Sequence, residues 1–98
     1  MEIKIPKSIN ILGFPFKIEK KPKSFLLELN GKKLIGKCNL GERKIILKEG
    51  EIMDIAFAHE LTEARHLLRH ESPTELEIHE EATFWLSIFK QLNKKIRR

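Results

Sequence analysis

Hydrophobic and polar residues alternate through the first half of the chain. Alternation with a period of two is typical of strands that bury one face. It recurs in four stretches, around residues 3–5, 14–18, 25–35 and 45–47. We therefore expect three or four strands, mostly antiparallel, within about residues 1–48.

Two turns are predicted between the later strands. Asn30-Gly31 separates an apolar run that ends at Leu29 from one that begins at Leu34. This dipeptide is a strong hairpin signal, because a type I′ turn needs positive φ at both central residues. A second turn is expected around residues 39–41.

The pattern becomes helical after Gly50. Residues 51–70 contain neither proline nor glycine. Apolar residues recur along one helical face: Phe57, Leu61, Ala64 and Leu68. We therefore expect a helix over about residues 51–70. Glu51 and Asp54 would lie in its first turn, where carboxylates favour the positive end of the helix dipole.

A second helix is predicted over about residues 73–95. Its start signal is Ser-Pro-Thr-Glu at 72–75, a capping box with proline at the first helical position. One long apolar stripe follows: Ile78, Ala82, Trp85, Phe89, Leu92 and Ile96. Trp85 lies in the middle of this stripe, so we expect it in the core. Strands followed by helices predict an α+β fold, with two packed helices on one side of a small sheet.

Length and composition limit this architecture to one domain, residues 1–98. The chain is 41% hydrophobic and 34% charged, as in globular proteins, and we expect no membrane association. Its single cysteine, Cys38, excludes an internal disulfide and favours a reducing, cytoplasmic location. We interpret Cys38 as a small apolar residue facing the sheet interior, too distant in pattern from the first helix to be a ligand.

The first predicted helix carries a candidate metal site in the sequence His59-Glu60-Leu61-Thr62-Glu63. Residues four apart are neighbours on a helix, so His59 and Glu63 could hold one metal ion, with Glu60 within reach of its water. Apolar residues lie on the same side: Ile52, Ile55 and Ala56. A helix that is apolar on two sides fits between two layers, and the site would then be partly buried. The alternative is an ordinary solvated stripe that also includes His66.

A third ligand is expected from the second helix, where three residues are candidates: His79, Glu80 and Glu81. His79 and Glu81 flank the apolar stripe, whereas Glu80 points away from it. Imidazole is the better ligand type, so His79 is preferred. The alternative for His79 is a polar residue at the edge of the helix interface.

Taken together, these segments resemble the very small zincin-like metallopeptidase domains of phages and prophages. The resemblance covers nearly the whole chain, in GKCNLGERKIILKEG, AFAHELTEARH and IHEEATFWLSIFKQL. Members combine a short sheet, a helix with H-E-x-x-H and a last helix with the third ligand. Some carry H-E-x-x-E-A and a later histidine, as HELTEA and IHEEATFWL do here.

The resemblance implies a zinc ion, or another divalent metal, held by His59, Glu63 and His79, with Glu60 as general base. A peptide or protein substrate would add as a strand to the exposed sheet edge. Glu63 replaces the usual histidine, which would weaken the metal as a Lewis acid, so proteolysis could be weak or absent. With Glu80 as third ligand, the pattern would be nearer to the ordinary zincin motif.

Two other functions stay open. A non-catalytic metal-binding or protein-interaction module would have a closed site, with His66 or a carboxylate in the fourth position. A nucleic-acid-binding accessory protein would use the basic clusters at 17–23 and 94–98, in a chain of net charge +5. A solvated basic surface is the simpler explanation of those clusters.

Overall fold

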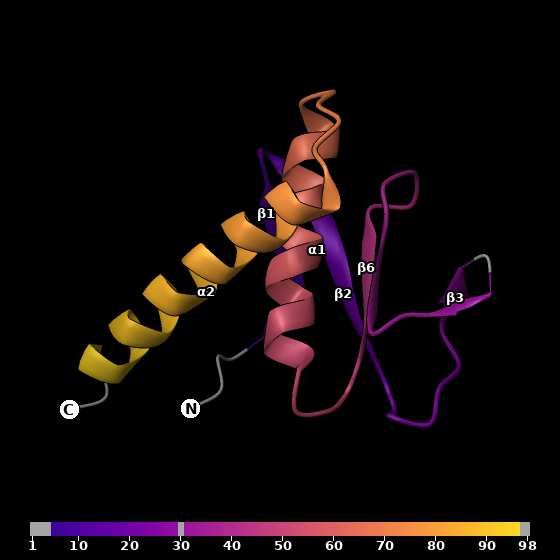
Figure 1. The fold of residues 1–98 in the computed structure, drawn as a ribbon, viewed down its shortest axis with the longest axis horizontal. Coiled ribbons are helices and arrows are strands. Elements are labelled where there is room, and N and C mark those ends of the chain that lie inside the picture. Colours follow the sequence, from indigo (N-terminus) through magenta and orange to yellow (C-terminus); the bar gives the residue numbers. More distant parts are fainter. Residues whose placement is uncertain (1–4, 30, 97–98) are drawn as a thin grey trace.

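The computed structural model describes residues 5–29 and 31–96. Strands come first and helices last, so the predicted α+β order is confirmed (Figure 1). The elements are β1 (Ser8–Ile11), β2 (Phe14–Lys21), β3 (Glu28–Leu29), β4 (Lys32–Lys33), β5 (Gly36–Asn39), β6 (Lys44–Lys48), α1 (Met53–Leu68) and α2 (Glu75–Ile96).

A four-stranded mixed sheet forms the base of the fold, in the order β1-β2-β6-β5. β1 pairs antiparallel with β2, and β5 with β6. The central pair, β2 and β6, is parallel. Its alternating side chains give the sheet one buried face, which holds Phe16, Ile18, Ile45 and Leu47.

The predicted Asn30-Gly31 hairpin is present as a small separate sheet. Leu29 of β3 pairs with Lys32 of β4, and Gly31 has a φ of 79°. Asn30 itself lies outside the described residues. The predicted turn near residues 39–41 is also confirmed, because it joins the antiparallel pair β5 and β6.

The predicted first strand lies elsewhere. Of its residues, Ile3 is outside the described part of the chain, and Ile5 is buried but precedes any strand. The first strand is β1, which the two-residue turn Leu12-Gly13 joins to β2. Both turn residues have positive φ, 51° and 86°, as a type I′ hairpin requires.

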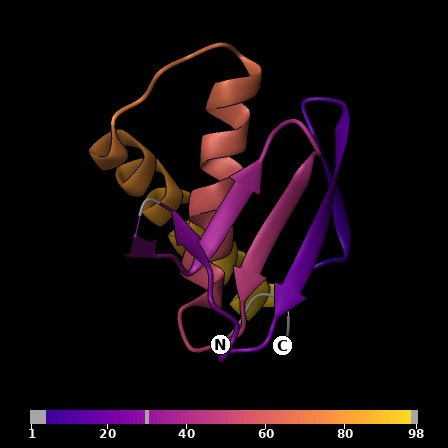
Figure 2. The ribbon, with the colours of Figure 1, turned by 90° about the vertical axis from the view of Figure 1, so that its right-hand side faces the viewer.

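α1 lies between the sheet and α2, which is the position that its two apolar sides predict (Figure 2). Phe57 and Ala64 pack into the sheet core, and Ala58 packs against Ala82 and Leu86 of α2. The helix starts two residues later than predicted. Asp54 is in its first turn, whereas Glu51 lies in the preceding turn.

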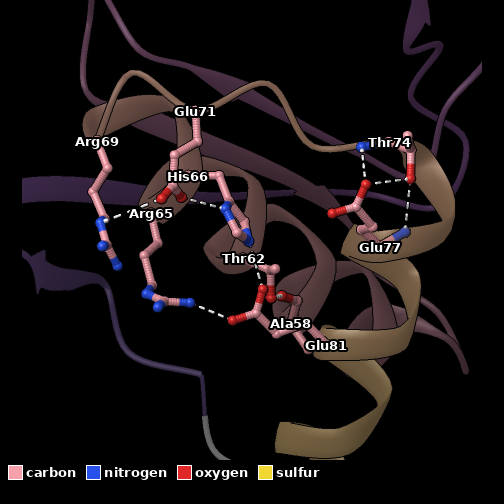
Figure 3. Close-up of polar contacts among 9 residues, drawn as sticks. All are labelled: Ala58, Thr62, Arg65, His66, Arg69, Glu71, Thr74, Glu77 and Glu81. Carbon is pink, nitrogen blue, oxygen red and sulfur yellow. Dashed lines mark hydrogen bonds and ion pairs between the residues drawn. The ribbon is translucent and has the colours of Figure 1, made fainter.

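α2 begins at Glu75, so the capping box predicted at 72–75 is wrong by two residues. Thr74 Oγ1 accepts a hydrogen bond from the Glu77 N–H at 3.2 Å, and the Thr74 N–H donates to Glu77 Oε1 at 3.3 Å (Figure 3). The chain contains two overlapping S/T-x-x-E sequences, and the second one forms the reciprocal cap.

The prediction that Trp85 belongs to the core is also wrong. Its exposed fraction is 45%, and the buried residues of this region of α2 are Ile78, Ala82 and Leu86. The reason is that α2 packs on α1 and, within the described residues, contacts no strand of the sheet. The apolar stripe is wider than the surface that α1 covers.

Charged side chains join the end of α1 to α2 in what we call the helix-junction network: Arg65, His66, Arg69, Glu71 and Glu81 (Figure 3). His66 Nε2 lies 2.5 Å from Glu81 Oε2, and His66 Nδ1 lies 2.6 Å from Glu71 Oε1. Arg65 also hydrogen-bonds to Glu81. The hydrogen bonds to Glu81 and Glu71 raise the pKa of His66. Burial by itself would raise the pKa of the Glu81 carboxyl, but His66 and Arg65 lower it.

Candidate metal centre

α1 brings three potential ligands together at its middle turns. One ligand atom each from His59, Glu60 and Glu63 lies within 4.8 Å of the other two. His59 Nδ1 is 3.2 Å from Glu60 Oε2. Glu60 has an exposed fraction of 6%, and His59 and Glu63 are partly buried. The predicted pair His59 and Glu63 therefore faces a partly buried gap, as expected for a helix between two layers.

Strand β5 makes room for the buried carboxylate. A Cβ atom added at Gly36 would lie 3.2 Å from Glu60 Cγ, 3.4 Å from its Oε2 and 3.2 Å from Leu47 Cδ2. These distances are shorter than most real Cβ contacts. The side chain of Glu60 thus occupies the space that any larger residue at position 36 would need.

Two of the three groups are carboxyl groups, and their negative charges repel each other in this partly buried pocket. Burial, and then the charge of Glu60, raise the pKa of Glu63, which also shares a hydrogen bond with Glu60. The hydrogen bond from His59 to Glu60 raises the pKa of His59, although burial opposes it. Two adjacent carboxyl groups can hydrogen-bond to each other only by sharing a proton. A divalent cation could take the place of that proton.

The donor types fit such a cation. Zinc binds imidazole nitrogen at about 2.0–2.1 Å and carboxylate oxygen at about 2.0–2.2 Å, so its ligand atoms lie about 3–4 Å apart. The 3.2 Å between His59 Nδ1 and Glu60 Oε2 is already in that range.

The first two turns of α2 face this cluster. Glu75 Oε2 lies 3.5 Å from His59 Nε2. His79 and His59 both line a cavity of about 500 Å³ that extends to Gly36 and Glu60. Glu75 and His79 are four residues apart, the same spacing as His59 and Glu63 on α1. Glu75 was not predicted as a neighbour of the site, because the sequence pattern places it in the capping box.

The other predicted candidates lie elsewhere. His66 belongs to the helix-junction network. Glu81 pairs with Arg65 and His66 in the same network, and Glu80 is exposed. His79 is exposed as well, but of the three residues considered on α2 it is the one that lines a cavity with His59.

Cys38 is nearer to the cluster than its place in the sequence suggested. It is partly buried and packs against the sheet core, as predicted. It stands two residues after Gly36 on β5, so both point to the same face of the strand. Burial, followed by the charges of Glu60 and Glu63, raises the pKa of its thiol to about 12. Cys38 therefore lines the sheet side of the site as a neutral thiol.

The cavity opens along the edge of the sheet. β5 pairs with β6 on one side and, within the described residues, has no strand on its other side. The walls of the cavity come from Lys33 to Gly36, before and at the start of β5, and from Ile55, His59 and His79 of the helices. An extended segment lying along β5 would thus pass the cluster.

Neither helix in the described residues has an apolar stretch of the length that a bilayer requires. Comparisons of this chain with protein-family models, with curated proteins and with solved structures find no match. The assignment of a function therefore rests on the geometry of the site.

Proposed function

We propose that this chain binds a divalent cation, zinc in preference, through His59 and Glu63 of α1 and His79 of α2. One observation carries the proposal: in a partly buried pocket the ligands His59 and Glu63 converge with the carboxyl group of Glu60, one atom of each lying within 4.8 Å of the others. Like charges this close destabilise the pocket unless a proton or a cation neutralises them. His79 completes the set, because it lines the same cavity as His59.

We further propose hydrolysis of peptide bonds, with Glu60 as the proton acceptor. A bound divalent cation would supply Lewis-acid chemistry at the carbonyl group. Glu60 is buried against Gly36 and held by His59, so its carboxylate has a fixed position beside the cation site. The substrate would be an extended peptide that pairs with the edge of β5. The carboxylate ligand Glu63 should make this activity weak.

Metal content tests the binding proposal. The protein purified without chelator, or stripped and reloaded with zinc, is expected to hold close to one zinc ion per chain. His59→Ala, Glu63→Gln and His79→Ala should each lower zinc affinity by about tenfold or more. Glu80→Gln is the matched control, because Glu80 is an exposed carboxylate on the same turn of α2 as His79. A wild type that takes up no zinc after reloading would refute the proposal.

Glu60→Gln separates binding from catalysis. The variant should retain the zinc but lose any hydrolysis of an unstructured peptide substrate.

Glu75→Gln tests whether the metal site is open or closed. The Glu75 carboxylate is already 3.5 Å from His59 Nε2. With Glu75 as a fourth ligand, the site would be closed and non-catalytic. In that case Glu75→Gln would weaken zinc binding and allow hydrolysis, whereas with an open site it would change neither.

A second function, binding of nucleic acid, is favoured by the outer face of the sheet. No helix covers this open sheet face (Figure 2). By strand alternation and register it carries five lysines: Lys17, Lys21, Lys37, Lys44 and Lys48. Lys17 pairs in register with Lys44, and Lys21 with Lys48. Glu19 is the acidic residue among them and lies 2.7 Å from Lys21.

Of the two predicted basic clusters, the one at 17–23 contributes Lys17 and Lys21 to this face. The cluster at 94–98 begins at the end of α2 and is not part of the sheet. Lys20 points to the other side of β2, where its Nζ donates to the Ile5 carbonyl at 3.0 Å. Arg97 and Arg98 lie outside the described residues. The test is binding of a labelled single strand at two salt concentrations. Lys17→Glu combined with Lys48→Glu should abolish a salt-sensitive binding, and an absence of any binding at low salt would exclude this function.

A further inference from the structure

The outward side of α2 carries large apolar side chains that are exposed or only partly buried. We call this set the α2 stripe: Phe84, Trp85, Ile88, Phe89 and Leu92. Phe84, Trp85, Phe89 and Leu92 have exposed fractions of 57%, 45%, 46% and 48%. At about 200 Å² for a large side chain, these four leave roughly 400 Å² of apolar surface in contact with water. This is the size of the largest apolar patch on a typical monomer, and such a patch is often functional.

The stripe is ordered by its own aromatic contacts. The ring of Trp85 meets Phe84 edge-on at 5.3 Å and stacks on Phe89 at 6.1 Å. Beside these rings, a cavity of about 140 Å³ lies between α1 and α2, lined by Phe57, Leu61 and Phe89 among others. The stripe and this cavity together form one apolar surface, on which a further large side chain could be seated.

The charges along α2 are divided between its two halves. The first half carries acidic residues and no lysine or arginine: Glu75, Glu77, Glu80 and Glu81. The second half and the residues after it carry basic residues and no acidic ones: Lys90, Lys94, Lys95, Arg97 and Arg98. A second α2 laid antiparallel on the first would therefore match acidic with basic halves at both ends. A parallel arrangement would place like charges together.

The shape of the chain leaves room for such a partner. The C-terminal half of α2 extends beyond α1, away from the sheet (Figure 1). The candidate metal centre involves Glu75 and His79 at the opposite end of the helix, on the side that faces α1. A partner on the stripe would thus leave the cavity at β5 accessible.

We propose that two copies of this chain associate through their α2 helices, packed antiparallel about a twofold axis near Ile88. Around that axis Ile88 faces its own copy and Phe84 faces Leu92. The apolar stripe then pairs with itself, and the acidic and basic halves alternate on its flanks. An interface of this kind is isologous, so it closes as a dimer and does not extend into a fibre.

The test of association is sedimentation equilibrium of the full chain across the micromolar range. A dimer is expected, with dissociation on dilution accompanied by a red shift in the emission of Trp85, the only tryptophan. Phe84→Ser and Leu92→Ser should each weaken dimerisation about tenfold or more. Leu76→Ser is the matched control, because Leu76 is 66% exposed on α2 but lies off the stripe. A chain that is monomeric at every concentration overturns the proposal.

Disulfide cross-linking tests the antiparallel geometry. In a Cys38→Ser background, Ile88→Cys should form an intermolecular disulfide rapidly on mild oxidation, because the two thiols meet at the axis. Leu92→Cys should not, because its counterpart lies about two turns of helix away, roughly 12 Å along the axis and beyond the reach of a disulfide. Cross-linking of both variants would indicate parallel helices. A dimer that persists with neither cross-link, and with wild-type affinity in Leu92→Ser, would place the interface elsewhere.

Discussion

At the scale of single residues, Gly36 determines whether Glu60 can be buried. Gly36→Ala would place a Cβ 3.2 Å from both Glu60 Cγ and Leu47 Cδ2. We expect the free energy of unfolding to fall by about 1–3 kcal/mol and zinc affinity to fall with it, because Glu60 must move. Urea denaturation and zinc titration measure the two effects.

Gly41→Ala is the control for that substitution. Its added Cβ would meet Asn39 Oδ1 at 3.6 Å, an ordinary contact, so stability should change little. Equal effects of the two substitutions would mean that the glycine at 36 has no special relation to the site.

The thiol of Cys38 reports on the carboxylates beside it. With a pKa of about 12, the folded protein holds far less thiolate at pH 8 than an unfolded chain does. Alkylation by iodoacetamide should therefore be about a thousandfold slower in the native protein than in urea. Glu60→Gln removes one of the charges that raise this pKa and should speed the native reaction. An unchanged rate would show that Cys38 and Glu60 do not interact.

At the scale of elements, the start of α2 provides a direct comparison between two possible caps. Thr74→Ala should cost about 1 kcal/mol of stability, because it removes the acceptor of the Glu77 N–H. Ser72→Ala should cost only a few tenths of that, although the sequence alone favours Ser72 as the cap. Thermal or urea unfolding of the two variants decides between them, and the reverse order of effects would contradict the observed helix start.

The helix-junction network should make the packing of α2 on α1 depend on pH. The pKa of His66 is raised in the folded chain. Its contribution to stability is therefore fully present below the unfolded value of about 6.5 and is lost as the pH rises through the folded value. Glu81, with a lowered pKa, contributes above its unfolded value and loses this as the pH falls. The network should be strongest between these two limits.

Urea unfolding from pH 5 to pH 9, in the presence of a chelator, measures this dependence. His66→Gln should flatten the loss of stability on the alkaline side, at a cost of about 1 kcal/mol at pH 6. His59→Gln must be run beside it, because the pKa of His59 is raised as well. A wild-type slope retained in full by His66→Gln would exclude His66 as its source.

At the scale of the whole molecule, a cation in the candidate centre should stabilise the fold, because on the proposed function it would join groups on both α1 and α2. Zinc at a hundred times its dissociation constant should add about 2.7 kcal/mol. For a domain of 98 residues this corresponds to a rise of about 10 °C or more in Tm. Differential scanning calorimetry checks the shift, which a chelator should reverse and His59→Ala should abolish.

The sequence predicted those parts of the fold that depend on local periodicity. Both helices, the Asn30-Gly31 hairpin and the neighbourhood of His59 and Glu63 follow from spacing along single segments. The parallel pairing of β2 with β6 does not, because it joins segments that are distant in the chain. Trp85 was misplaced because periodicity shows that a side of a helix is apolar but not what covers it. Glu75 and Cys38 were missed as neighbours of the site because their proximity depends on how separate elements pack.

The order of strands and helices that form the site has a consequence for how the chain folds during synthesis. Gly36, Cys38, Glu60 and Glu63 all lie within residues 36–63, on β5 and α1, with only β6 between those elements. Contacts between segments so close in the chain form early in folding, because little loop entropy is lost. Ribosomes add about 5–20 residues per second, so this half of the site can assemble before α2 has emerged. Selectivity for a particular cation would then be determined last, when α2 folds onto α1 and brings Glu75 and His79 to the site.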